Sequence, residues 1–238
     1  MYKKILKKNL IINYKLNKCY KSRNIISTTN PKFKLYAFCI NLKNRKYNMD
    51  FIHSEWNEYL NIIRFIASPS ATKSHVKILQ YIYLNRNNIK FPIVIMEDDV
   101  YRKNNFTKYW NQLLDLTECD YVAFDAFFLI FKKNNNVPKD FVSLKEHRMM
   151  GFTVYYKRFF DRFTTLKDLN NVINKGIIDT CFTHNPLLIK YTPKEQVCCQ
   201  IVSKYSTTCN SNTNNYINFY LIAEKKLKML SYFNLLKK

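Results

Sequence analysis

The sequence predicts an α/β fold in which helices flank a mixed but mainly parallel sheet. Short apolar runs alternate with segments whose apolar residues recur at helical spacing, and this β-α-β-α-β order is typical of a parallel sheet covered by helices. The first and third runs are continuously apolar, as expected for strands buried on both faces. The chain has 238 residues, of which 47% are hydrophobic, which is enough for one substantial domain.

Three strands and two helices are expected in the first half of the chain. Each strand candidate is a short apolar run, and each helix candidate has apolar residues three or four positions apart. Ser68-Pro69-Ser70 ends the second strand candidate. In chain order, the segments are 35–42, 50–60, 62–67, 71–86 and 92–97.

The second half continues with amphipathic helices and aromatic strands. Residues 132–148 are polar and are predicted to be a loop, and 203–215, rich in Ser, Thr and Asn, are predicted to be mobile. The remaining candidates are a helix at 106–114, strands at 120–128, 152–156 and 197–202, and helices at 159–166 and 223–236. We therefore expect three parts: a basic N-terminal extension over 1–33, the main domain over 34–222, and a basic C-terminal helix over 223–238.

The third strand ends directly in Glu97-Asp98-Asp99, although the chain holds only 17 acidic residues against 39 basic ones. Ligands of parallel sheets gather beyond the carboxyl ends of the strands, so these acids are expected to share one crevice with Asn41 and Ser68. Because alternate strand residues point the same way, Glu97 and Asp99 are predicted to hold Mn²⁺ or Mg²⁺. The alternative is a strand end running into a turn, with an Asp capping the next segment.

The net charge of +22 favours polyanionic partners. One alternative function is therefore a basic nucleic-acid-binding protein, and the charge also allows weak binding to polyanions or to an anionic membrane surface. The other interpretation of the charge is lysine spread over a solvated surface. With only two glycines, Gly151 and Gly176, the chain lacks a P-loop and a dinucleotide-binding fingerprint.

Cysteine spacing and hydropathy indicate the cellular compartment of the protein. The seven cysteines form no CxxC pair and no zinc spacing, which indicates reduced, mostly buried thiols. No signal-peptide core and no apolar stretch of membrane-spanning length is present. A cytoplasmic location is therefore predicted. The bias toward Lys, Asn, Ile and Tyr is typical of AT-rich genomes such as those of some large DNA viruses, parasites and bacteria, and the host cytoplasm is expected if the protein is viral.

Short motifs recur in a fixed order along the main domain. They are Ile40-Asn41-Leu42-Lys43-Asn44-Arg45, Arg64-Phe65-Ile66-Ala67, Ser74-His75, Ile93 to Asp99, Asp120-Tyr121, Asp179, and Pro193 to Gln200 with Ser206. In order and spacing they resemble the motifs of the family-25 glycosyltransferases, which include lipooligosaccharide and procollagen galactosyltransferases and also occur in large DNA viruses. The resemblance covers roughly residues 35–205.

The resemblance implies a GT-A-type, Rossmann-like fold and a metal-dependent hexosyltransferase. Such an enzyme moves galactose or glucose from a nucleotide-sugar donor, commonly a UDP-sugar, to a hydroxyl of a glycan or protein. Departures at Asn48, Ser70 and Asp125 keep open a non-catalytic, glycosyltransferase-like protein. The implied roles are metal binding by Glu97 and Asp99, and nucleotide-sugar binding by Asn41, Arg45, Ser74, His75 and Asp98.

An inverting transfer needs a carboxylate that takes the proton of the acceptor hydroxyl. Asp179 and Asp125 are the two candidates, because both lie near predicted strand ends or turns. The aromatic neighbours of Asp125 favour a raised pKa and stacking of an acceptor sugar. The alternatives are a turn residue for Asp125, a helix cap for Asp179, and a buried structural histidine for His75.

Overall fold

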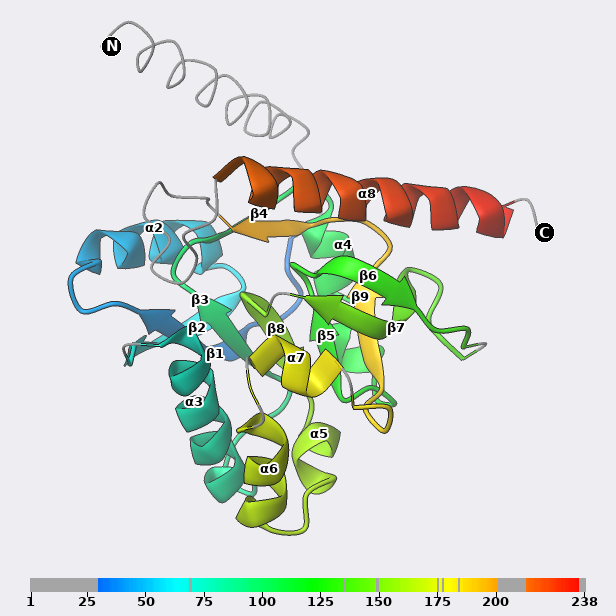
Figure 1. Ribbon diagram of the computed structural model, residues 1–238. Helices are drawn as coiled ribbons and strands as arrows, with labels where there is room; N and C mark the ends of the chain where they lie inside the picture. Colours follow the sequence, from blue (N-terminus) through cyan, green and yellow to red (C-terminus); the bar gives the residue numbers. More distant parts are fainter. Residues whose placement is uncertain are drawn as a thin grey trace, which may run out of the picture.

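The protein is described by a computed structural model, which places residues 30–68, 70–134, 136–148, 150–174, 176, 178–183, 185–200 and 213–235. Figure 1 shows the arrangement of its elements. The strands are β1 (Leu35–Asn41), β2 (Leu60–Ile66), β3 (Ile93–Glu97), β4 (Val100–Arg102), β5 (Tyr121–Ala123), β6 (Phe127–Phe131), β7 (Phe141–Arg148), β8 (Phe152–Tyr155), β9 (Lys190–Pro193) and β10 (Cys198–Gln200). The helices are α2 (Lys46–Trp56), α3 (Ala71–Asn85), α4 (Phe106–Trp110), the 3₁₀-helix η2 (Leu113–Asp115), α5 (Lys157–Asp161), α6 (Leu166–Ile173), α7 (Ile178–Thr183) and α8 (Thr213–Leu235).

The main sheet has eight strands in the order β2-β1-β3-β8-β5-β9-β7-β6. β1 is parallel to both β2 and β3, and β5 is parallel to β9, whereas β8 and β7 run against their neighbours. β4 and β10 form a separate antiparallel pair. The predicted mixed α/β sheet of the GT-A, Rossmann-like type is therefore confirmed, and the parallel β1, β2 and β3 end at one edge.

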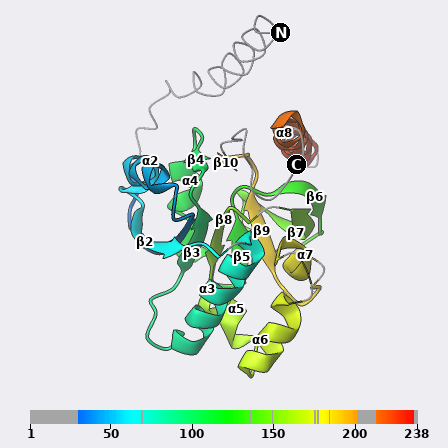
Figure 2. The same ribbon diagram turned by 60° about the vertical axis from the view of Figure 1, so that its left-hand side comes forward.

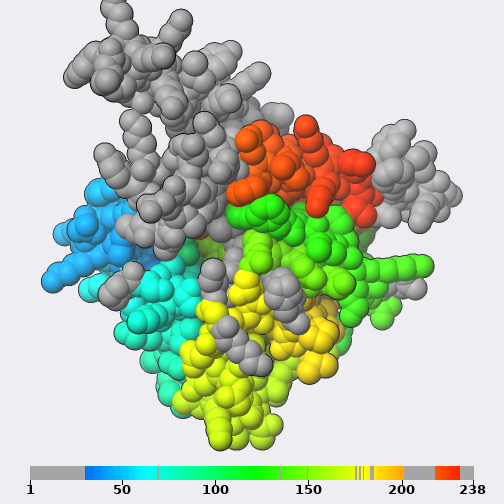
Figure 3. Space-filling model, viewed as in Figure 1, coloured from blue at the N-terminus to red at the C-terminus, as the bar shows by residue number. Residues whose placement is uncertain are grey.

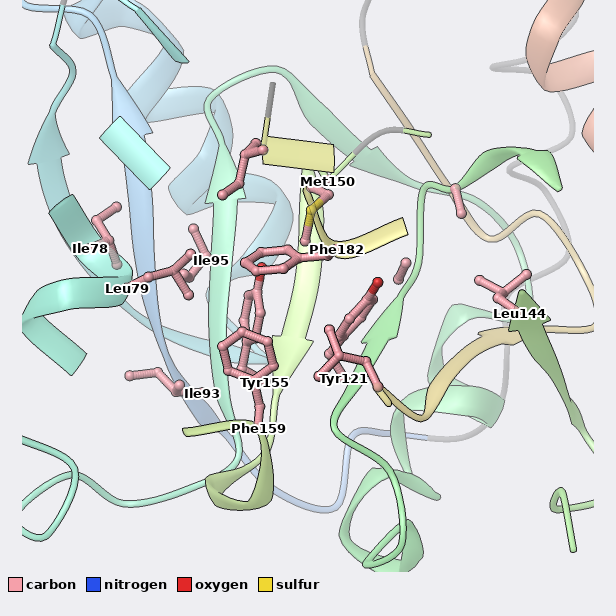
Figure 4. Packing of buried hydrophobic residues seen from close by; sticks show 14 of the residues in the cluster. Ile78, Leu79, Ile93, Ile95, Tyr121, Leu144, Met150, Tyr155, Phe159 and Phe182 are labelled. Carbon is pink, nitrogen blue, oxygen red and sulfur yellow. The ribbon is translucent and has the colours of Figure 1, made fainter. Parts of the chain in front are cut away.

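Helices cover both faces of the central part of the sheet, so that β3 is buried on both sides. On β3, Ile93 and Ile95 belong to the core that includes α3, α5, α6, α7 and α8, while Val94 and Met96 belong to the core beneath α2 and α4. Figure 4 shows Leu79 of α3 facing Ile93 and Ile95. In Figure 2 as in Figure 1, α3 and α6 lie side by side, at the end of the molecule remote from α8.

The C-terminal helix begins earlier than the sequence predicts. The expected bounds were 223–236, whereas α8 spans Thr213–Leu235 and buries Tyr220, Ala223 and Leu227 in the core. Figure 3 shows α8 in orange and red lying against the green segment that contains β6. Aromatic contacts join these elements, since the ring of Phe219 stacks on that of Phe127 at 5.3 Å.

The helix expected at 159–166 is divided between α5 and α6, and two predictions about strands and loops were also wrong. The expected strand at 120–128 is divided into β5 and β6, and Phe128 has a positive φ of 51° just after the break. The expected loop at 132–148 contains β7, which pairs with both β6 and β9. In both segments the strand boundaries are set by hydrogen bonding with neighbouring strands. Even a polar segment forms a strand when the strands beside it supply backbone hydrogen-bond partners.

Some expectations fall on residues outside the description. These are the N-terminal extension up to residue 29 and residues 203–212 of the segment 203–215 that was predicted to be mobile. The last three residues of that segment belong to α8, so the prediction was wrong there. In the described part of the chain, Cys39, Cys119, Cys181, Cys198 and Cys199 are free thiols. No helix within that part has the length and apolarity needed to cross a membrane.

Candidate active site

Five polar residues meet at the carboxyl edge of the sheet: Asn41 at the end of β1, Glu97, Asp98 and Asp99 at and after the end of β3, and Asp125 after β5. The register of β1 and β3 pairs Ile40 with Glu97, which places the last residue of β1 beside the acidic triplet. Strands from separate parts of the sequence therefore deliver these side chains to one place, as the β-α-β order predicts.

The carboxylate of Glu97 is held from two sides. Its Oε1 lies 3.3 Å from Nε2 of His75, which is almost completely buried on α3. Its Oε2 accepts a hydrogen bond of 2.9 Å from Nε2 of Gln200 on β10. The backbone is fixed as well, because Glu97 N donates to the O of Gly151, the residue before the neighbouring strand β8, at 2.8 Å. Glu97 is therefore positioned by residues that lie far apart in the sequence.

Asp98 has different partners and lies on the other side of the strand. Its Oδ2 accepts a short hydrogen bond of 2.6 Å from Nδ2 of Asn41, and its Oδ1 lies 3.9 Å from the guanidinium of Arg45. Asn41 in turn accepts from Nε of Arg64 at 2.8 Å. Burial raises the pKa of Asp98, and the Asn41 amide and Arg45 act in the opposite direction. Asp98 thus connects the end of β3 to Asn41 and to the loop that carries Arg45.

Asp99 is the least compensated of the three acids. Its Oδ1 is buried and has no hydrogen-bond partner among the described residues. Burial raises the pKa of Asp99 well above its usual value, and the charges of Glu97, Asp98 and Asp125 raise it further. Arg45 lowers that pKa only in part. Asp99 therefore presents an oxygen that the described part of the chain does not satisfy.

Asp125 lies fully buried beneath the same edge. Neither of its oxygens has a well-formed hydrogen bond with a described residue. Burial raises the pKa of Asp125 to about 7, the backbone at Phe152 and Gly151 lowers it in part, and Glu97 raises it. A Cβ atom at Gly151 would lie 2.6 Å from Asp125 Oδ2 and closer still to Nε2 of Gln200. These groups are therefore packed without space for a further side chain.

Three residues that the sequence singles out are not part of this cluster as far as the structure describes them. Ser74 Oγ accepts from Ser68 N at 2.9 Å and donates to Ser70 O at 3.1 Å, so it fixes the start of α3. Asp179 lies in α7, and its side chain is outside the description. Asp120 lies at the other end of β5, where Arg162 Nε and Ile189 N bind it, both at 2.6 Å.

The sequence did not assign a site role to four residues that contact the cluster: Arg64, Gly151, Gln200 and Tyr220. Tyr220 of α8 is buried, and its hydroxyl accepts from Gln200 N at 3.3 Å. Gly151 offered a usable signal, because the chain has only two glycines. Gln200 ends the segment Pro193 to Gln200 of the family resemblance, but no role followed from that match. Tyr220 offered no signal, since its proximity to Gln200 depends on how distant segments fold together.

The donor atoms of the cluster determine which metal ions it suits. Within the described ranges, no three His, Cys, Asp or Glu side chains are grouped so as to hold a metal ion. The unsatisfied acceptors are carboxylate oxygens of Asp99 and Asp125, which suit a hard cation. Mg²⁺ and Mn²⁺ are typically held by one or two protein carboxylates together with phosphates and water. The residues therefore fit a cation shared with a phosphate ligand better than one enclosed by protein alone.

No protein-family model and no curated protein matches this sequence. Among solved structures, A197 from STIV superposes with a TM-score of 0.50 and 11% identity, over 72% of this chain and 87% of that chain. HddC from Yersinia pseudotuberculosis gives a TM-score of 0.40 and 8% identity, over 80% of this chain and 78% of that chain. Its complex with GMP-PN gives 0.36 and 8%, over 74% and 72%. The protein shares its fold with A197 from STIV.

Proposed function

We propose that the protein is a metal-dependent glycosyltransferase of the family-25 type. It moves galactose or glucose from a nucleotide-sugar donor, such as a UDP-sugar, to a hydroxyl of a glycan or protein. The observation that carries this proposal is the meeting of Asn41, the acidic triplet and Asp125 at the carboxyl edge of a GT-A-type sheet. This is the edge at which α/β sheets bind their ligands.

In this proposal Glu97 and Asp99 hold Mn²⁺ or Mg²⁺ together with the diphosphate of the donor. Support comes from the oxygen of Asp99 that has no partner among the described residues and from the two partners that orient Glu97. The bound cation supplies Lewis-acid stabilisation of the leaving diphosphate. His75 acts through Glu97, whose carboxylate it contacts from the buried side of α3. Without a cation, the neighbouring carboxylates repel one another, and this repulsion favours cation binding.

The nucleotide lies, in this proposal, along the side formed by Asn41, Arg45 and Asp98. Arg45 contributes positive charge for a phosphate, and Asp98 fixes it by the 3.9 Å ion pair. Arg64 adds a second guanidinium on the same side, anchored through its Nε to Asn41. Ser74 contributes indirectly, by shaping the start of α3 on the donor side.

Asp125 is the general base that we favour for an inverting transfer. A carboxylate with a pKa of about 7 is ionised in a large share of molecules at neutral pH and still binds a proton well. Burial and the charge of Glu97 raise the pKa of Asp125, which suits a group that accepts a proton near neutral pH. Asp179 remains the second candidate, because it belongs to the resemblance.

The test is turnover of UDP-galactose and UDP-glucose with and without Mn²⁺, in the wild type and in Asp99→Ala. We expect metal-dependent donor hydrolysis or transfer in the wild type and its loss in the variant. Asp161→Ala is the matched control, since Asp161 is exposed and pairs only with Lys157 in the described structure. Equal metal-dependent activity in wild type and Asp99→Ala would refute the role of Asp99. A folded wild type that binds no UDP-sugar with Mn²⁺ would instead support a non-catalytic relative.

We also propose weak binding to polyanions or to an anionic membrane surface, supported by the net charge of +22. Binding to single-stranded DNA should fall steeply as salt rises, because counterions are released. This binding should not depend on Asp99, which sits in an acidic cluster. If the wild type bound DNA in this salt-dependent way but turned over no UDP-sugar, the nucleic-acid-binding alternative would take precedence.

A further inference from the structure

We propose that Gln200 is a positioning residue that holds the Glu97 carboxylate in the orientation needed for cation and donor binding; this inference rests on the proposed function. Gln200 is the last residue of β10, and it donates from Nε2 to Glu97 Oε2 at 2.9 Å. With His75 at the other oxygen, the carboxylate has a partner at each end. Two partners fix its rotation, which one partner alone would leave free.

Gly151 provides an independent observation for the same unit. A Cβ atom there would lie 3.0 Å from Cδ of Gln200 and closer to its Nε2, and 2.6 Å from Asp125 Oδ2. Gly151 is not among the described glycines with positive φ, so its backbone does not require glycine. The requirement is space for the Gln200 amide. In a chain with only two glycines, one of them leaves room for this contact.

The backbone of Gln200 is anchored from two further directions. β10 pairs with β4 so that Gln200 lies opposite Val100, the residue that follows the acidic triplet. Gln200 N donates to the buried hydroxyl of Tyr220 on α8 at 3.3 Å. The placement of β10 and α8 is thereby coupled to the orientation of a side chain on β3.

This geometry predicts an effect on ligand binding rather than on the fold alone. A residue that orients a metal ligand typically contributes 10- to 100-fold to metal affinity. The Gln200 amide also directs its N–H dipole at Glu97, which offsets repulsion from neighbouring carboxylates. Loss of the amide should therefore weaken cation and donor binding together.

The first experiment is a double-mutant cycle in unfolding, without any ligand, between Glu97→Ala and Gln200→Leu. If the amide holds the carboxylate, the two changes are non-additive by about tenfold in the unfolding constant, as for a hydrogen bond to a charged group. Additive effects would overturn the proposal. This measurement decides the contact even if the wild type binds no cation or UDP-sugar, which would refute the proposed function separately.

The second experiment titrates Mn²⁺ with UDP present and follows the thermal midpoint. Gln200→Leu is expected to weaken the Mn²⁺ affinity by about tenfold or more. Gln200→Asn keeps the amide but is one methylene shorter, so it should show the same loss, and it replaces the leucine variant if that fails to fold. The control is Gln112→Leu, because Gln112 donates to the carboxylate of Asp140 at 3.1 Å, remote from the site. Wild-type affinity in both Gln200 variants would overturn the proposal.

Discussion

Asn41 and Asp98 form the shortest link at the carboxyl edge described here, with 2.6 Å between Nδ2 and Oδ2. The same amide nitrogen donates to the backbone oxygen of Arg45 at 2.9 Å, and the amide oxygen accepts from Nε of Arg64 at 2.8 Å. One fully buried side chain therefore connects the ends of β1, β2 and β3 with the loop before α2. It also compensates Asp98, whose burial is otherwise unfavourable.

Replacement of Asn41 by alanine should destabilise the protein and disorder the donor side of the site. The change leaves a buried carboxylate without its closest partner, which costs about 1–3 kcal/mol. Urea unfolding measures this loss, and Asn61→Ala on the exposed edge strand β2 is the control, expected within about 0.5 kcal/mol of wild type. Equal losses in both variants would mean that the network contributes nothing specific.

The change Asp99→Asn should raise the stability of the metal-free protein while abolishing its stabilisation by Mn²⁺. The wild-type carboxylate is buried at one oxygen, lacks a partner there among the described residues, and is repelled by Glu97 and Asp98. A neutral amide of nearly the same shape removes that repulsion. Thermal unfolding with and without Mn²⁺ measures both effects. A lower thermal midpoint for metal-free Asp99→Asn than for metal-free wild type would show that other groups stabilise the Asp99 carboxylate, and would contradict this prediction.

The sequence was sufficient for the part of the fold that depends on local pattern. Continuous apolar runs predicted β1 and β3, and helical spacing predicted α3, so the position of Asn41 beside the triplet followed from topology alone. The acidic triplet was a recognisable signal because acidic residues are scarce in this chain. Local pattern and global topology agree in this region, which is why the prediction worked.

Prediction failed where contacts join distant segments. Gln200 lies 103 residues from Glu97, and no local pattern indicates that they meet. β7 was missed because its sequence is partly polar and its pairing with β6 and β9 supplies the strand geometry. The break between β5 and β6 was also missed because it depends on a contact between distant segments. It places Asp125 beside Gly151 rather than within a regular strand ladder.

Asp125 should make stability depend on pH. Its pKa is raised from 3.8 to about 7, so its favourable contribution is complete below about pH 4 and is lost as pH rises through about 7. The difference corresponds to about 4 kcal/mol between acidic and alkaline limits. Asp125→Asn removes this contribution, so the free energy of unfolding of the variant, relative to wild type, should rise between pH 5 and pH 8. Urea unfolding across that range measures it.

The variant Asp125→Asn also distinguishes between Asp125 and Asp179 as the general base. If Asp125 takes the proton, wild-type transfer should increase as pH rises through about 7, because only the ionised carboxylate accepts a proton. Asp125→Asn should then lose transfer but still bind the donor. Transfer that persists in Asp125→Asn and disappears in Asp179→Asn would assign the base to Asp179 instead.

Asp120 should matter for stability and not for the site. It is fully buried at the amino end of β5, where Arg162 Nε and Ile189 N donate to it. Asp120→Asn removes a charge-assisted partner from Arg162 and should cost about 2 kcal/mol. The affinity of the folded variant for Mn²⁺ and a UDP-sugar should stay at the wild-type value, since the site forms at the opposite end of the strand. A loss of affinity at full folding would place Asp120 in the binding machinery and would contradict the separation of the two ends.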